Sequence, residues 1–246
     1  MRIIDAHCGI GPWQKRDRLL PYRPEEILNL LDHFGIQEAL AYSNYAVGNG
    51  SAARGNRLLV EACRKHPRLR PAFTIFPNPH DDQPGVADQF AEMRGAGGRA
   101  ARLCPPQVAC EWVAEEIYAA CAERRVPLFL DKQGIVPDDV HRICREFPGL
   151  RLVLTGVGYG EDWWLYPLLR RHENIYVCLG HFYIPSNNPM RFLRHFPAER
   201  MIFGSGLPHF SPGGLIAHLT YADISEADRD KILFGNIERL LSEAQP

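Results

Sequence analysis

The sequence predicts a single (β/α)8 barrel over residues 1–246. The chain has the length usual for one such barrel. Eight short apolar segments alternate with amphipathic segments through short connections, and this order favours parallel strands with right-handed crossovers. An open doubly wound sheet would need a glycine-rich phosphate loop after an early strand. The segment that follows the first apolar run matches such a loop poorly, because Pro12 and a long loop replace the expected helix start.

The expected elements follow from hydrophobic periodicity. In the first predicted helix, for example, Ile27, Leu30, Leu31 and Phe34 recur at helical spacing. Strands are predicted at 2–11, 38–45, 69–76, 98–103, 126–131, 150–155, 174–179 and 200–205. Helices are predicted at 25–34, 53–65, 86–94, 112–124, 138–147, 163–171 and 190–196, with closing helices at 215–219 and 225–241.

The composition is that of an ordinary globular protein. Hydrophobic residues make up 46% of the chain and charged residues 23%, and the formal net charge is -1. No run of lysine or arginine favours a nucleic-acid partner. Seven scattered cysteines without a C-x-x-C pair indicate reduced thiols. With no signal peptide and no apolar stretch of roughly 20 residues, we expect a cytoplasmic protein with no membrane partner. A homodimer is the default for such a barrel.

The first predicted strand ends in polar residues. Alternation along a strand places Asp5, His7 and Gly9 on one face, toward the lumen of a barrel, and Ile4, Ala6 and Cys8 on the other. Cys8 is therefore expected in the core rather than as a nucleophile paired with His7.

Several segments resemble the amidohydrolase superfamily, in particular its amidohydrolase-related (amidohydrolase 2) branch. Ile-Ile-Asp-Ala-His7 resembles the opening strand, which that family writes Asp-x-His-x-His; Gly9 stands at the second histidine. Residues 126–131, 152–158 and 202–208 resemble strands five, six and eight, and 234–241 the closing helix. In these segments, metal ligands of the family are replaced by Asp131, Gly156 and Gly206.

The resemblance implies a degenerate metal site. A catalytic zinc site usually needs three protein ligands, and His7 with Asp131 supplies two. The glycines also remove volume, so a larger or repositioned ligand is expected to enter.

Active sites of (β/α)8 barrels lie at the carboxyl ends of the strands, and seven residues there are candidates. The catalytic candidates are His7, Asp131 and Lys132, which together can perform metal-free acid–base chemistry. The candidates for substrate binding are Arg102, His181, His209 and Trp163. Arg102 suits a substrate carboxylate through its bidentate fork. Each candidate also has a purely structural interpretation. His7 and Asp5 can be buried relics of a lost site, and Asp131 and Lys132 a solvated pair. His181 and His209 can be exposed loop residues, and Trp163 a packing residue.

Three functions remain open. The first is an amidohydrolase-like hydrolase or decarboxylase that acts on a small carboxylate, lactone or ester and has no metal cofactor. The second is a non-catalytic relative that serves as a ligand-binding or regulatory subunit. The third is a zinc or manganese site rebuilt from His7, Asp131, His181 and His209.

Overall fold

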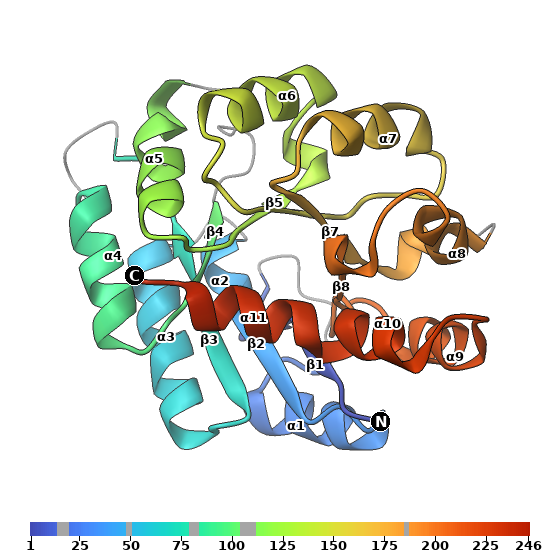
Figure 1. Cartoon of the computed structure of the whole chain (residues 1–246). Helices are drawn as coiled ribbons and strands as arrows, with labels where there is room; N and C mark the ends of the chain where they lie inside the picture. The colour runs from blue at the N-terminus through green and yellow to red at the C-terminus, as the bar shows by residue number, and fades with distance from the viewer. Residues whose placement is uncertain (14–19, 48–50, 79–83, 104–111, 185–186) are drawn as a thin grey trace.

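The computed structural model describes residues 1–13, 20–47, 51–78, 84–103, 112–184 and 187–246. Its eight strands pair in parallel, in the order in which they occur in the sequence, so the predicted barrel is confirmed (Figure 1). The strands are β1 (Ile4–Ile10), β2 (Glu38–Ser43), β3 (Leu69–Ile75), β4 (Ala100–Leu103), β5 (Leu128–Asp131), β6 (Leu152–Thr155), β7 (Ile175–Leu179) and β8 (Met201–Phe203).

Helices follow the strands and cover the outside of the barrel (Figure 1). They are α1 (Pro24–His33), α2 (Asn44–Val47), α3 (Ala52–Lys65), α4 (Val86–Gly95), α5 (Glu115–Glu123), α6 (Pro137–Glu146), α7 (Asp162–Arg171), α8 (Asn188–Leu193), α9 (Gly213–Tyr221), α10 (Glu226–Asp230) and α11 (Asn236–Glu243). The single helix predicted at 225–241 is interrupted by a π-helical turn at Lys231–Gly235. No helix among the described residues is both long and apolar enough to span a bilayer.

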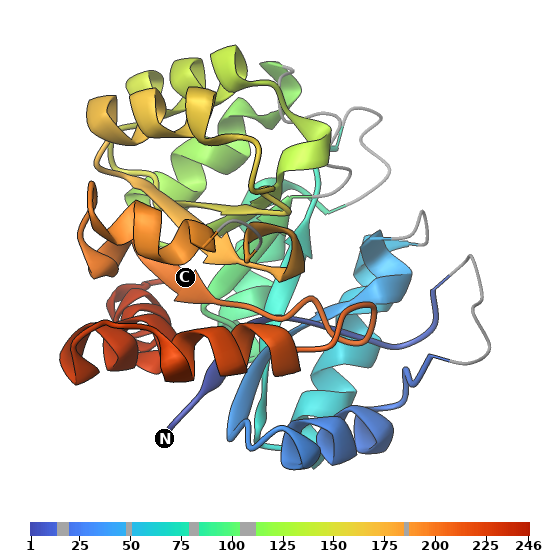
Figure 2. The ribbon, with the colours of Figure 1, turned by 90° about the vertical axis from the view of Figure 1, so that its right-hand side faces the viewer.

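Side chains alternate between two buried layers. Along β4, Ala101 and Leu103 pack in the layer between strands and helices, whereas Ala100 packs in the smaller cluster inside the barrel. That inner cluster also contains Leu240 and Leu241 of α11, so this helix closes the end of the barrel at which the strands begin. The strands run away from that end, toward the right in Figure 2. The opposite end, where the strands finish, is called the barrel mouth below.

The first and last strands meet at the mouth through loop residues rather than a regular ladder. The backbone N–H of Gly206 donates to the carbonyl of His7 (2.9 Å), and that of Gly9 donates to the carbonyl of Leu207 (2.7 Å). The Asp5 carboxylate lies between these strands and accepts hydrogen bonds from the backbone and side chain of Ser205. Asp5 thus takes part in closing the barrel.

The alternation predicted for β1 is correct for His7 and Cys8 but wrong for Ile4, Asp5 and Ala6, because Ile4 and Ala6 pack inside the barrel and Asp5 lies on the opposite face. Asp5 pairs with Ala39 and Cys8 with Ala41, so three steps along β1 match two along β2. This is a β-bulge, which inserts one extra residue and reverses the side-chain order beyond it. Asp5 consequently shares its face with Cys8, not with His7. Cys8 is buried in the outer core, as expected.

Candidate functional site

Polar side chains line the inner wall at the barrel mouth. Tyr42, Thr74, Arg102 and Asp131 each stand two residues beyond an apolar residue of the inner cluster, so they continue the same inner face toward the mouth. Arg102 therefore faces inward, which the sequence left undecided. The layer of apolar side chains inside the barrel gives way here to groups that can bind a ligand.

Arg102 is a buried cation with few partners. Its side chain is only 7% exposed, and its guanidinium lies over the ring of Tyr42, with Cζ 4.4 Å from the ring centre. Its nearest acid is Asp131, with 3.7 Å between Nη2 and Oδ2, which is an ion pair but too long for a hydrogen bond. Among the described residues, no oxygen accepts a hydrogen bond from this guanidinium. A buried arginine normally has its donors satisfied, so this one is suited to an incoming anion.

His7 lies beside this cation. Its ring centre is 5.2 Å from that of Tyr42, and its Nε2 atom is buried without a hydrogen-bond partner among the described residues. Burial, and then the positive charges of Arg102 and His209, hold the pKa of His7 well below its ordinary value of 6.5. His7 is therefore neutral at pH 7, and Nε2 can accept a hydrogen bond or a proton in the tautomer that leaves it unprotonated.

Asp131 and Lys132 do not pair with each other. Asp131 Oδ1 accepts a hydrogen bond from the backbone N–H of Gln133 (2.9 Å), while Oδ2 faces Arg102. Lys132 forms an ion pair with Glu161, whose other oxygen accepts a hydrogen bond from the N–H of Gly158 (2.6 Å). Asp131 belongs to the inner wall, and Lys132 lies at its rim with 35% of its side chain exposed.

The glycines at two family ligand positions do not leave open space, which corrects the expected gain in volume. A Cβ atom on Gly9 would lie 2.2 Å from Oδ1 of Asn44, and one on Gly206 would lie 2.9 Å from the ring of Phe210. Gly206 also has a φ of +77°, which disfavours any side chain. Asn44 and Phe210 therefore occupy the space that a side chain at these two positions would enter.

The metal-ligating side chains that the structure describes at the mouth do not form a cluster that fits a metal ion. Among the described residues, no three of the side chains of His, Cys, Asp or Glu lie close enough to hold one. The predicted set of His7, Asp131, His181 and His209 is thus not assembled here. The Arg102 guanidinium also faces Asp131, where its charge would repel a cation.

The other predicted residues lie around the rim. His209 packs edge-on against Trp13, with ring centres 5.4 Å apart, and His181 stacks on Phe210 at 5.3 Å. Trp163, at the start of α7, is 77% exposed. Cys104, the residue after β4, lies outside the described residues.

Four residues of the mouth were not predicted from the sequence. Tyr42 and Asn44 follow the apolar run of β2, and Thr74 lies in β3, with a buried hydroxyl that has no partner among the described residues. Their place at strand ends was the signal that could have found them. Glu161 is paired with Lys132 by the turn before α7, and no sequence pattern marks it.

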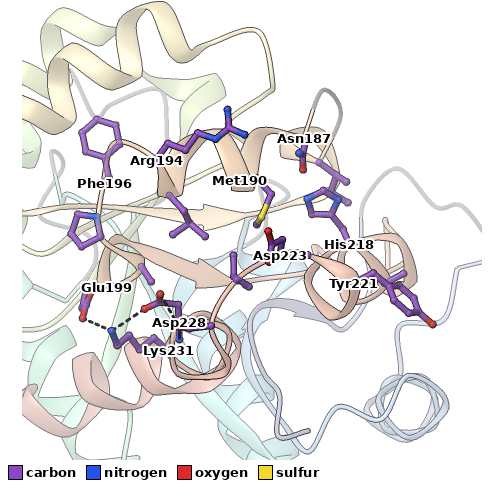
Figure 3. A pocket seen from close by; sticks show the side chains of 18 of the residues that line it. Asn187, Met190, Arg194, Phe196, Glu199, His218, Tyr221, Asp223, Asp228 and Lys231 are labelled. Carbon is purple, nitrogen blue, oxygen red and sulfur yellow. Dashed lines mark hydrogen bonds and ion pairs between the residues drawn. The ribbon is translucent and has the colours of Figure 1, made fainter.

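A separate groove of about 1130 Å³ lies on the outer surface, between α8, α9 and α10 (Figure 3). Lys231 bridges Glu199 and Asp228 at one end of it. Its walls combine apolar side chains such as Met190 and Phe196 with charged residues of both signs. None of the residues predicted as site residues lines this groove.

Comparison with known proteins identifies the family. The chain matches the amidohydrolase family over residues 4–242. It belongs to that family. No curated protein sequence matches the chain.

Solved structures of similar fold include three whose alignments cover almost the whole of this amidohydrolase. An uncharacterised TIM-barrel protein from Bordetella bronchiseptica has 20% identity and a TM-score of 0.79, with 100% of both chains covered. A dihydroxybenzoic acid decarboxylase from Polaromonas, solved with manganese and the inhibitor 2-nitroresorcinol, has 17% identity and a TM-score of 0.77, covering 98% of this chain and 96% of that one. A 2,6-dihydroxybenzoate decarboxylase from Rhizobium has 16% identity and a TM-score of 0.75, with 98% of both chains covered. At these identities the likeness concerns the fold.

Proposed function

We propose that this amidohydrolase binds a small carboxylate at the barrel mouth through Arg102 and acts on it without a metal ion. The observation that carries the proposal is a buried guanidinium whose donors have no hydrogen-bond acceptor among the described residues. A carboxylate satisfies such a fork with two parallel hydrogen bonds and compensates its charge. The named relatives that act on dihydroxybenzoates support a carboxylate as the ligand.

The proposed reaction is hydrolysis of a lactone or ester that bears this carboxylate. His7 Nε2 takes a proton from water as the water oxygen bonds to the carbonyl carbon, and then returns it to the leaving alkoxide as the C–O bond breaks. The bound carboxylate offsets the charge of Arg102, which raises the pKa of His7 and makes it a better base. Asp131 holds the guanidinium in place, and Lys132 adds positive charge for the developing oxyanion.

Hydrolysis is favoured over decarboxylation by the protonation state of His7. Decarboxylation ends with proton delivery to carbon, which needs a protonated donor. The lowered pKa of His7 leaves its imidazole neutral, so it is suited to accept a proton first.

The test uses two lactones that differ in a carboxylate. γ-Butyrolactone-3-carboxylate and γ-butyrolactone are incubated with protein treated with EDTA, and with protein supplied with manganese or zinc. We expect hydrolysis of the carboxylated lactone alone, unchanged by EDTA and abolished in Arg102→Met and His7→Gln. Activity that appears only with added metal, or that persists in both variants, contradicts the proposal.

A second candidate is a binding protein without turnover. It is favoured by Asn44 and Phe210, which fill the positions of family metal ligands. Here 2,6-dihydroxybenzoate would raise the melting temperature of the wild type but not of Arg102→Met, and no lactone or dihydroxybenzoate would be consumed. Resorcinol, which lacks the carboxylate, is the matched control ligand.

A further inference from the structure

We infer that Asp5 and Ser205 are positioning residues that turn the His7 side chain into the barrel mouth. The catalytic consequence rests on the proposed role of His7, whereas the positioning itself does not. The inference depends on the β-bulge in β1 and on the hydrogen bonds that surround it.

The bulge decides which way His7 points. In a regular strand, His7 would share the face of Asp5, whose partner Ala39 packs in the outer layer. The extra residue between Asp5 and Cys8 reverses this order, and His7 instead approaches Tyr42 inside the barrel. A bulge leaves the local ladder disrupted, so another group must hold the backbone there.

Asp5 supplies that group. Its Oδ1 accepts the backbone N–H of His7 (3.0 Å) and that of Ser205 (2.8 Å), and its Oδ2 accepts the hydroxyl of Ser205. The same hydroxyl accepts the N–H of Leu207 (2.9 Å). One buried carboxylate therefore joins the bulge to the loop after β8, 200 residues further along the chain. The hydrogen bond that Asp5 accepts from the N–H of His7, two residues further along, fixes the backbone at that point.

Gly204 completes the arrangement. A Cβ atom at Gly204 would lie 2.9 Å from Cβ of His7 and 2.3 Å from Sγ of Cys178. The absence of a side chain there leaves room for His7 beside β8. The loop after β8 thus both anchors Asp5 and admits His7.

The test measures the position of His7 in the ligand-free protein. Selectively labelled protein is examined by NMR for the nuclear Overhauser effect between the rings of His7 and Tyr42, which are 5.2 Å apart. We expect this signal in the wild type and in Asp5→Asn, which keeps the acceptor oxygen. We expect it to be lost in Asp5→Ala and weakened at least twofold in Ser205→Ala.

Asp162→Ala is the matched control, because it also removes a largely buried carboxylate but one that accepts from Tyr183, far from β1 in the chain. It should leave the His7–Tyr42 signal unchanged. If Asp5→Ala lowers the melting temperature while the signal persists in folded protein, Asp5 is only structural and the inference is wrong. If Asp5→Ala does not fold, Ser205→Ala decides, since an unchanged signal there overturns the inference.

A kinetic measurement separates this inference from the proposed function. If the carboxylated lactone is hydrolysed, Ser205→Ala should lower kcat about tenfold and leave KM within about twofold, because Arg102 still binds the carboxylate. Loss of binding would contradict the inference. If the wild type hydrolyses nothing, the proposed reaction fails while the NMR result still judges the positioning of His7.

Discussion

Arginines at the two ends of the barrel are held in different ways. At the closed end, Arg200 donates to the carbonyls of Leu169, His172 and Ile175, and Arg99 donates to the carbonyl of Ala244 after α11. At the mouth, Arg102 is more deeply buried than either of these arginines but has only a 3.7 Å ion pair with Asp131. An arginine whose donors are satisfied stabilises the fold. An arginine whose donors are not satisfied lowers the stability of the protein but leaves those donors available to a ligand.

The largest effect is expected at the closed end. Arg200→Met leaves three carbonyl groups without their donor, and each lost hydrogen bond costs about 1 kcal/mol. The free energy of unfolding should fall by about 3 kcal/mol, as measured by urea denaturation. If the free energy of unfolding fell by less than about 1 kcal/mol, Arg200 would not stabilise the fold more than Arg102 does, and the two ends of the barrel would not differ.

The second effect concerns acid. Folding lowers the pKa of His7 below 6.5, so below this pH the unfolded chain binds a proton at His7 and the folded chain does not. The free energy of unfolding therefore falls as the pH is lowered below 6.5. Each pH unit in this window is worth at most about 1.4 kcal/mol. The wild type should therefore lose more of its free energy of unfolding than His7→Gln between about pH 6.5 and pH 5 in parallel urea titrations, by at most about 2 kcal/mol. Identical pH profiles would mean that the pKa of His7 is not lowered.

The counterpart of Arg200→Met at the mouth should leave stability almost unchanged. Arg102→Met removes a buried charge without breaking a hydrogen bond to a described residue, so the free energy of unfolding should stay within about 1 kcal/mol of the wild type. The same urea titration measures it. A loss as large as that in Arg200→Met would show that Arg102 is structural and would count against the proposed site.

The smallest effect is expected at the rim. Glu161→Gln keeps an oxygen for the N–H of Gly158 but removes the charge partner of Lys132. Since Lys132 is partly exposed, the stability should fall by less than about 1 kcal/mol. A melting curve at two salt concentrations checks this, because the small difference should vanish at high salt. A larger loss that persists in salt would place Lys132 and Glu161 in the core of the site.

The fold was predictable because its information is local. Each strand is an apolar run of a few residues, and each helix carries a periodic apolar face, so the sequence alone predicts the eight units. The bounds moved by a few residues, as at β8, which is Met201–Phe203 rather than 200–205.

The site was predictable only where one strand decides a side chain. Asp131 and Lys132 lie at the end of β5, as the sequence predicts. His7 faces the lumen as predicted, but it does so because a bulge reverses the order of side chains after Asp5. The bulge itself was not predictable, since Ser205 helps to hold it from the far end of the chain. The space at Gly9 depends on Asn44, the first residue of α2 after the neighbouring strand β2, and that at Gly206 on the fold of the loop that carries Phe210. A substitution pattern reveals which ligands are missing but not what has replaced them in space.

The bond between Asp5 and Ser205 also bears on the order in which the protein is made. Asp5 leaves the ribosome 200 residues before Ser205, which donates to both of its carboxylate oxygens. Contacts between such distant residues form late, because the intervening chain must first be ordered. The bulged first strand therefore gains its bonds to Ser205 only after the eighth unit has emerged. A nascent chain that lacks this unit holds the histidine and the arginine of the site but not the serine that helps to turn the histidine inward.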